Sequence, residues 1–208
     1  METHLMQQGT DAWHQVRCGR VTASRVADII AKTKTGYSAS RENYLAQLVC
    51  ERMTGKPTES FTNAAMLHGT ETEPFARAAY EAATDVLVEE VGFVVHPNIE
   101  GAGASPDGLV GLFGLVEIKC PNTATHIQTL LDQKVPEKYN TQMQWQMSCT
   151  GRQWCDFVSF DPRMAEGLQL FIKRVEYDPI YVSQLEKEVI FFLMDVEEKI
   201  NKLNKLKA

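Results

Sequence analysis

The sequence has no apolar run near the roughly 18 residues that a membrane-spanning helix requires. Its opening segment, METHLMQQGTDAWH, contains no basic stretch followed by an apolar core, so we expect no secretory signal. Hydrophobic residues make up 44% of the chain and charged residues 23%, which disfavours disorder except at the ends. These features indicate a globular protein, and we expect it in the cytoplasm.

Cysteines are few, and their spacing matches no common metal site. The five occur singly, without a Cys-x-x-Cys pair, at Cys18, Cys50, Cys120, Cys149 and Cys155. An odd number at such spacings argues against a disulfide framework and against a zinc or iron–sulfur centre. We therefore expect five reduced thiols.

The chain also lacks an excess of positive charge. Its formal net charge is −6 and its pI is near 5.4, which by itself disfavours a nucleic-acid partner because phosphates repel an acidic protein. The charge is uneven, however. Residues 17–41 carry six Lys or Arg side chains, and Asp28 is the one acid within that stretch. A local basic surface is therefore expected on an acidic whole.

Hydrophobic periodicity predicts an α/β (α+β) fold with a mixed sheet. Helices are expected at 12–19, 25–32, 41–55, 64–83, 137–151 and 179–206. Strands are expected at 86–97, 109–114, 114–120, 152–161 and 168–178, with loops at 32–40 and 101–108. With 208 residues and no repeat or linker, we expect a single domain comprising a helical part (1–84), a sheet core (85–177) and a long final helix (179–206).

The stretch GASPDGLVGLFGLVEIKCP places two acids and a lysine in a small, apolar context. Side chains alternate along a strand, so Glu117 and Lys119 share one face and lie roughly 6.5 Å apart. Asp107 lies ten residues before Glu117, in a Pro-Asp-Gly turn. A turn followed by a short hairpin can return the chain so that Asp107 lies beside Glu117.

Two carboxylates and a backbone carbonyl are the oxygen ligands that Mg²⁺ and Mn²⁺ prefer. A neighbouring lysine can hold water and stabilise charge on a phosphate, which suits metal-assisted phosphodiester hydrolysis. Taken singly, a PDG triplet is most often an ordinary turn, and Glu-x-Lys is most often a salt-bridged pair. The combination in an apolar strand is what favours the metal site.

The pattern PD…EIK resembles the PD-(D/E)xK nuclease signature. More narrowly, SPDG-L…G-L-x-E-x-K-C-P resembles the phage lambda exonuclease family of alkaline exonucleases, the YqaJ-like viral recombinases. Four further motifs occur in the family's order: D-A-W-H-x-x-R-x-G-x-x-T-A-S at 11–24, H-G-x-x-x-E at 68–73, Y-x-x-Q-x-Q at 139–144 and F-D-P-R-M at 160–164. The resemblance spans about residues 9–168 and implies a restriction-endonuclease-like core.

The resemblance also implies roles for individual residues. It makes Asp107, Glu117 and the carbonyl of Ile118 metal ligands, and it makes Lys119 the group that orients the attacking water. Glu73 corresponds to an acid near a second metal, and Gln142 to a glutamine that supports the site. Binding of the DNA 5′-phosphate is implied for Arg17, Ser24 and Ser105, since a guanidinium and hydroxyls make a good phosphate pocket.

The function implied is a Mg²⁺-dependent 5′–3′ exonuclease on double-stranded DNA, with two ions per active site and Mn²⁺ able to substitute. Such an enzyme leaves a 3′ single strand for a single-strand annealing protein. The family forms a homotrimeric ring around DNA and acts in the bacterial cytoplasm, encoded by a phage or a prophage.

Three alternatives remain open from the sequence. The nearest is another PD-(D/E)xK nuclease, an endonuclease or a junction resolvase. The others are an inactive DNA-end-binding protein and a plain partner-binding domain. Single residues are also ambiguous: His68 either touches the metal or packs, Met66 and Leu67 either part the duplex or pack, and Trp13 and Trp145 are expected in the core.

Overall fold

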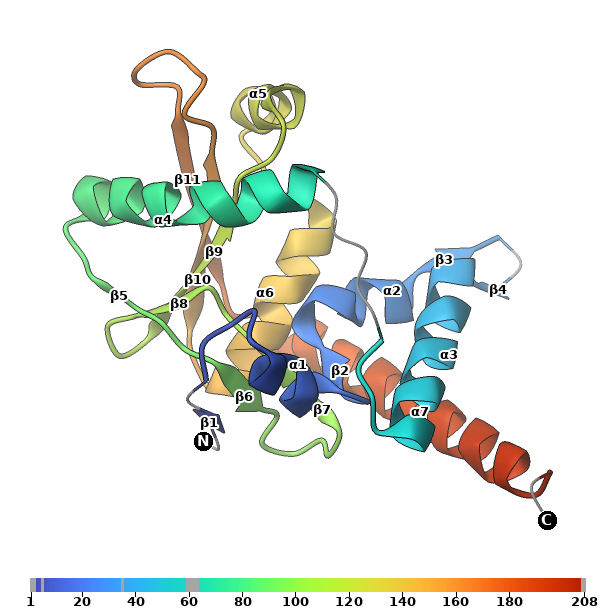
Figure 1. Ribbon diagram of the computed structural model, residues 1–208. Coiled ribbons are helices and arrows are strands. Elements are labelled where there is room, and N and C mark those ends of the chain that lie inside the picture. The colour runs from blue at the N-terminus through green and yellow to red at the C-terminus, as the bar shows by residue number, and fades with distance from the viewer. Residues whose placement is uncertain (1–2, 5, 35, 59–63, 207–208) are drawn as a thin grey trace.

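A five-stranded mixed sheet forms the centre of the computed structural model, which describes residues 3–4, 6–34, 36–58 and 64–206 (Figure 1). The strand order is β11-β10-β9-β8-β5. In that order the strands are Leu170–Glu176, Trp154–Phe160, Gly114–Lys119, Gly108–Val110 and Val88–Glu89. The pair β9–β10 is parallel and the other pairs are antiparallel, so the predicted mixed sheet and α+β class are confirmed.

A second sheet, in the order β1-β6-β7-β2, was not predicted as a separate sheet. Its strands are Thr3–His4, Phe93–Val95, Ala102–Ala104 and Val21–Thr22. The segment 86–97, expected as one strand, divides between the two sheets, and part of the expected 101–108 turn is strand β7. Small residues are needed there because a Cβ atom on Gly103 would clash with the ring of Phe93. The composition that suggests a turn therefore reflects close strand packing.

The predicted 32–40 loop contains a small hairpin, β3 (Lys32–Thr33) with β4 (Gly36–Tyr37). Both of its strands contact the final helix. The Lys32 ammonium donates to the Glu188 carboxylate at 3.1 Å, and the Tyr37 hydroxyl donates to the same carboxylate at 2.8 Å. Polar contacts to a distant helix, which local sequence does not reveal, hold this hairpin.

The predicted helices are present, with one addition. They are α1 (Asp11–Arg17), the 3₁₀ turn η1 (Ala23–Arg25), α2 (Val26–Ile30), α3 (Ala39–Thr54), α4 (Ala64–Thr84), α6 (Glu137–Thr150) and α7 (Pro179–Asn204). The addition is α5 (Thr123–Asp132), whose N-cap Asn122 accepts a hydrogen bond from the Thr125 amide at 2.9 Å.

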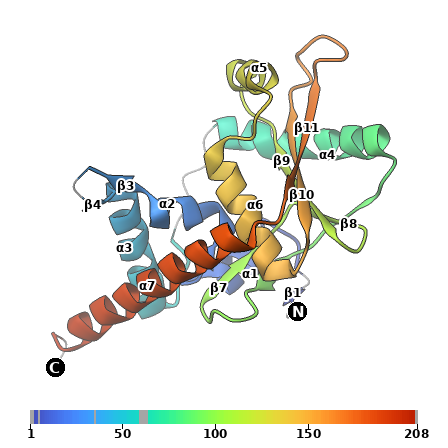
Figure 2. The same ribbon diagram turned by 180° about the vertical axis from the view of Figure 1, so that it is seen from behind.

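The helices cover the main sheet on both faces (Figures 1 and 2). Helix α4 packs one face through Ala76 and Tyr80, which join Val116 and Ile118 of β9 in one apolar cluster. Leu115 of β9 belongs to the larger cluster on the opposite face, which includes α6, α3 and α7. The predicted alternation along β9 is thus confirmed.

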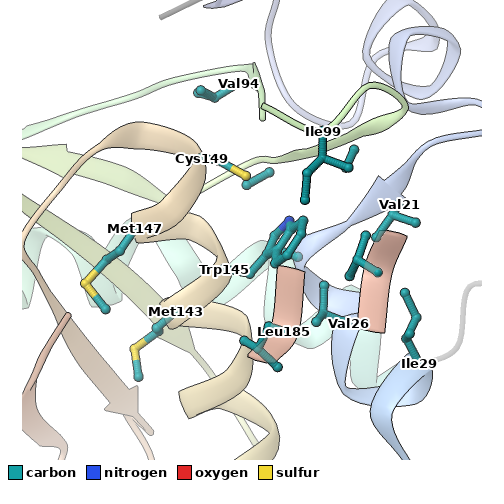
Figure 3. Packing of buried hydrophobic residues seen from close by; sticks show 14 of the residues in the cluster. Val21, Val26, Ile29, Val94, Ile99, Met143, Trp145, Met147, Cys149 and Leu185 are labelled. Atoms are coloured by element: carbon teal, nitrogen blue, oxygen red, sulfur yellow. The ribbon is translucent and has the colours of Figure 1, made fainter. Parts of the chain in front are cut away.

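Helix α6 organises the larger cluster. Figure 3 shows Trp145 pointing toward Val26 and Leu185, while Met143 and Met147 point to the other side of the helix. Trp145 is fully buried, as predicted.

None of the helices in the described part of the chain combines the length and the apolar composition of a membrane span.

Candidate active site

The hairpin β8–β9 brings the two predicted acids together. Its register pairs Gly108 with Val116, so the preceding residue, Asp107, reaches the level of Glu117. The Asp107 carboxylate accepts a hydrogen bond from the Ile118 amide at 2.7 Å, which fixes the carboxylate against strand β9. The return of the chain expected from the PDG turn and hairpin is therefore present.

Lys119 lies between the two acids. Its ammonium forms an ion pair with the Glu117 carboxylate and lies 3.9 Å from the Asp107 carboxylate. These two acids raise the pKa of Lys119 well above its ordinary value, although burial opposes that shift. Lys119 therefore stays an ammonium, able to donate protons in hydrogen bonds and unable to accept one.

Two glutamines of helix α6 donate hydrogen bonds to the Glu117 carboxylate. The Gln142 amide donates to Glu117 Oε1 at 2.6 Å, and the Gln146 amide donates to Glu117 Oε2 at 2.6 Å. The sequence motif identified Gln142 and Gln144, but Gln144 lies on another face and donates to the Glu176 carbonyl instead. The spacing of four residues between Gln142 and Gln146 is the signal that could have identified the pair.

Glu117 is fully buried, and its carboxylate shares the Lys119 ammonium with Asp107. Burial and, after it, the nearby Asp107 carboxylate raise the pKa of Glu117 to about 7, although Lys119 and the amide of Gln146 oppose the shift. A single lysine shared by two carboxylates leaves an excess of negative charge in this site. That imbalance favours a bound cation.

Glu73 approaches this cluster from helix α4. Burial raises the pKa of Glu73, and Asp107 adds to the effect, while Arg77 and Lys119 lower it. Arg77 also forms an ion pair with the Glu73 carboxylate at 3.2 Å. Glu73 is thus within electrostatic reach of Asp107 but is partly neutralised by its own helix.

Three residues at the start of α4, Met66, Leu67 and His68, were ambiguous in the sequence. Met66 and Leu67 are about half exposed. The His68 Nδ1 atom lies 3.3 Å from the Thr72 hydroxyl, and its Nε2 atom is buried without a hydrogen-bond partner in the part of the chain that the structure describes. Met66 and Leu67 are therefore not part of the buried core.

The donor set at the acids fits Mg²⁺. Among the described residues, no three His, Cys, Asp or Glu side chains gather into a metal cluster. Mg²⁺ needs fewer protein ligands than that, because it keeps several waters and is held by one or two carboxylates together with substrate phosphates. Asp107 and Glu117 supply two such carboxylates, and the excess charge around Glu117 is what a divalent ion would offset.

A second cluster contains Ser105, which lies two residues before Asp107 in the sequence. The Arg17 guanidinium stacks 3.7 Å from the centre of the Trp13 ring and donates to the Ser105 hydroxyl oxygen at 3.4 Å. The Trp13 indole N–H donates to the same oxygen at 3.0 Å. Burial lowers the pKa of Arg17 to about 10, so it stays charged at neutral pH. Trp13 is only partly buried and belongs to this cluster, so the expectation that it lies in the core is wrong.

Ser24 lies at the same edge of the second sheet as Ser105. Strands β2 and β7 are parallel and pair Thr22 with Gly103, so the residues that follow each strand leave the sheet together. Ser24 lies in η1 and is exposed. Of the predicted phosphate-binding residues, Arg17 and Ser105 are in contact, and Ser24 is brought to the same side without a contact between them.

Much of the basic stretch at residues 17–41 is neutralised. Arg25 pairs with Asp28 at 2.7 Å, Lys32 pairs with Glu188 at 3.1 Å, and Arg41 pairs with Asp195 at 2.7 Å. The local basic surface expected from the sequence is therefore smaller than a count of cations indicates. The physical reason is that acids of helix α7, distant in sequence, fold back onto it.

The family model for the YqaJ-like viral recombinase domain matches residues 12–153 of this chain. The chain belongs to this family. The matched segment contains Asp107, Glu117 and Lys119, both glutamines that hold Glu117, and the Trp13–Arg17–Ser105 cluster. The family that the sequence motifs indicated is thus confirmed.

Solved structures agree with this assignment. The chain is similar to an alkaline exonuclease (LHK-Exo) from Laribacter hongkongensis, with 51% identity, a TM-score of 0.90, and coverage of 96% of this chain and 98% of that one. The same enzyme in complex with dAMP matches at 52% identity with the same TM-score and coverage. A phage-related exonuclease from Haemophilus somnus 129PT, at 13% identity and a TM-score of 0.68 over 94% of this chain and 99% of that one, shares the fold. Among curated protein sequences, none matches this chain.

Proposed function

We propose that this member of the YqaJ-like family is a Mg²⁺-dependent exonuclease that digests one strand of double-stranded DNA from its 5′ end. Membership in the family and the likeness to an alkaline exonuclease support a nuclease that acts on DNA. The observation that carries the proposal is the assembly of Asp107, Glu117 and Lys119, with an excess of buried negative charge around one shared ammonium. Such a site suits a divalent ion and a phosphodiester.

Each group then has a distinct task. Asp107, Glu117 and the carbonyl of Ile118 hold Mg²⁺, or Mn²⁺ in its place, and Glu73 with Asp107 serves a second ion. When bound, Mg²⁺ supplies Lewis-acid stabilisation of the charge on the scissile phosphate. The Lys119 ammonium donates to the attacking water and to phosphate oxygens, which orients the first and stabilises charge on the second.

The Trp13–Arg17–Ser105 cluster supports attack from the 5′ end. Ser105 lies two residues before Asp107, so the cluster adjoins the acids. The Ser105 oxygen already accepts hydrogen bonds from Trp13 and Arg17, so its own O–H remains to donate to a phosphate. With Ser24 at the same edge, these groups suit a terminal 5′-phosphate. LHK-Exo binds dAMP, a 5′-mononucleotide, and we propose that this chain releases 5′-mononucleotides.

An end-labelled linear duplex tests the proposal directly. With Mg²⁺, label at the 5′ end is expected to appear at once as mononucleotide, whereas label at the 3′ end is expected to stay in a long single strand. A covalently closed, nick-free circular plasmid serves as the control and is expected to remain intact. Early release of the 3′ label would contradict the polarity, and cutting of the circle would favour an endonuclease or a resolvase.

We further propose that three chains form a ring around DNA in the bacterial cytoplasm and that the 3′ strand passes to a single-strand annealing protein. A closed ring explains processive digestion, because an enclosed polymer cannot leave sideways. The exposed apolar side chains of Ile190, Phe191 and Met194 on helix α7 support an assembly that covers them. Native mass spectrometry is expected to show a species of three 23.4 kDa chains.

A further inference from the structure

We propose that Gln146 is a positioning residue that fixes the rotation of the Glu117 carboxylate and so sets the affinity of the acid site for a divalent cation. The assignment rests on the proposed function, because it takes Glu117 as a ligand. Gln146 is fully buried on helix α6, and its amide donates to Glu117 Oε2 at 2.6 Å. Gln142 and the ion-pair contact of Lys119 lie on the other oxygen, Oε1.

The two oxygens of Glu117 have different partners. Oε1 accepts from the Gln142 amide at 2.6 Å and pairs with the Lys119 ammonium, whereas the Gln146 amide is the donor to Oε2. Gln142 and Lys119 alone would hold one oxygen and leave the carboxylate free to turn about it. A donor on each oxygen fixes its plane, and therefore fixes which lone pairs face a cation.

The side-chain oxygen of Gln146 indicates that packing alone does not account for a glutamine at this position. Its Oε1 atom is buried and has no hydrogen-bond partner in the part of the chain that the structure describes. A buried acceptor without a donor is destabilising. Met143 and Met147, its neighbours on the same helix, are fully buried apolar residues. A methionine at position 146 would have similar volume without that cost, so the amide donor, and not packing, accounts for a glutamine here.

Gln144 provides a matched comparison within the same helix. It is also buried, but its amide is used at both ends, donating to the Glu176 carbonyl at 2.8 Å and accepting from the Asp178 amide at 2.9 Å. These contacts join α6 to the end of β11 and the start of α7. Gln144 is thus a structural glutamine, and Gln146 is held to the acid site.

Mn²⁺ binding to the full-length, metal-free protein without DNA provides a readout independent of activity. Electron paramagnetic resonance of free Mn²⁺ gives the dissociation constant. Gln146→Met is expected to weaken Mn²⁺ binding by about tenfold or more, the usual effect of removing a residue that orients a metal ligand. Gln144→Met, the matched control, is expected to lower the melting temperature and to leave the dissociation constant within about twofold.

A folded Gln146→Met protein with the dissociation constant of the wild type overturns the inference. If that variant does not fold, Gln146→Asn decides, because its shorter amide cannot reach Oε2 and should weaken binding equally; wild-type binding by this variant also overturns the inference. Glu117→Gln distinguishes a failure of the inference about Gln146 from a failure of the proposed metal site. Its loss of Mn²⁺ binding without any effect of Gln146→Met rejects only the inference, whereas wild-type binding by Glu117→Gln rejects the proposed metal site.

Discussion

Two fully buried carboxylates, Glu117 on strand β9 and Asp161 just after strand β10, show opposite electrostatics. Arg163 donates to both oxygens of Asp161, at 2.7 and 3.0 Å, and the Thr123 hydroxyl adds a third bond at 2.7 Å. These hydrogen bonds lower the pKa of Asp161 to about 2, although burial opposes the shift. Glu117 shares one lysine with Asp107, and burial raises its pKa to about 7.

The difference shows that burial of an acid serves two purposes on the neighbouring strands β9 and β10. The Arg163 guanidinium neutralises the charge of Asp161 within the fold. Through Thr123, Asp161 also links the segment after β10 to the start of α5. Glu117 is surrounded mainly by neutral amide donors, so its site keeps a surplus of negative charge. The buried acid with a cation of its own is structural, and the acid that shares its cation with a second carboxylate is available for a cation from solution.

The arginines show the same contrast. Arg163 is committed to Asp161, whose carboxylate raises the pKa of the guanidinium. Arg17 contacts a tryptophan ring and a hydroxyl, both uncharged, and burial lowers its pKa to about 10. Among the described residues, no carboxylate lies within ion-pair distance of Arg17, so its guanidinium is available for an anion, which a terminal phosphate would supply.

Removing the shared lysine is expected to give the largest effect. Lys119→Ala takes away the one ammonium between Asp107 and Glu117 and should lower the rate of hydrolysis by about three orders of magnitude. DNA binding should remain close to that of the wild type, because the phosphate cluster is intact. Single-turnover digestion and binding of a labelled duplex in Ca²⁺ measure the two quantities. Cutting at near the normal rate would remove the assigned role of Lys119.

Removing Arg163, the partner of Asp161, should lower the stability of the protein and leave the rate of hydrolysis unchanged. Arg163→Ala leaves the buried Asp161 carboxylate with Thr123 and one backbone amide. We expect the free energy of unfolding to fall, by less than for a fully buried pair because Arg163 is half exposed. Urea denaturation measures this loss. A strong decrease in the rate of DNA hydrolysis by the folded variant, with unchanged stability, would contradict a purely structural role for Asp161.

Removing the free guanidinium should weaken recognition of the terminus. Arg17→Ala is expected to narrow the preference for 5′-phosphate over 5′-hydroxyl ends by about tenfold, the effect of losing one charge-assisted bond of about 1.4 kcal/mol. Initial rates on two duplexes that differ in this group alone measure the ratio. Arg174→Ala, which breaks an ion pair with Asp156, is the control and should leave the ratio unchanged. An unaltered ratio in Arg17→Ala would exclude the pocket.

The smallest expected effect is on the pH dependence of stability without metal. The pKa of Glu117 rises from its ordinary value of 4.5 to about 7 on folding, so the folded chain favours the protonated form. The resulting stabilisation is complete below about pH 4.5 and is lost as the pH rises through 7, about 1 kcal/mol between pH 6 and pH 8. Thermal unfolding in chelator should show this loss, and Glu117→Gln should abolish it. Added Mg²⁺ should restore stability at pH 8.

Local pattern predicted a large part of the site. The period of two along β9 placed Glu117 and Lys119 on one face, and the hairpin after Asp107 returned that acid to them, because both depend on neighbours in the chain. The long final helix followed from its apolar stripe in the same way. The motifs then identified the family.

Other features depended on contacts between distant segments. Gln146 was missed because the meaning of a third glutamine in α6 depends on which face of the helix meets β9. Strand β7 resembles a turn, since its glycine and alanines are small in order to let two strands pack closely. The pairing of Lys32 and Arg41 with acids of α7 joins residues more than 150 positions apart.

The sequence by itself determined which groups are present and which of them share a strand or helix face, because those relations follow from backbone periodicity. Only the tertiary structure decided their charge states. A pKa depends on the solvent removed and the charges within a few ångströms. Around Glu117 these come from β9, from the segment before β8 and from α6, which meet only after the chain has folded.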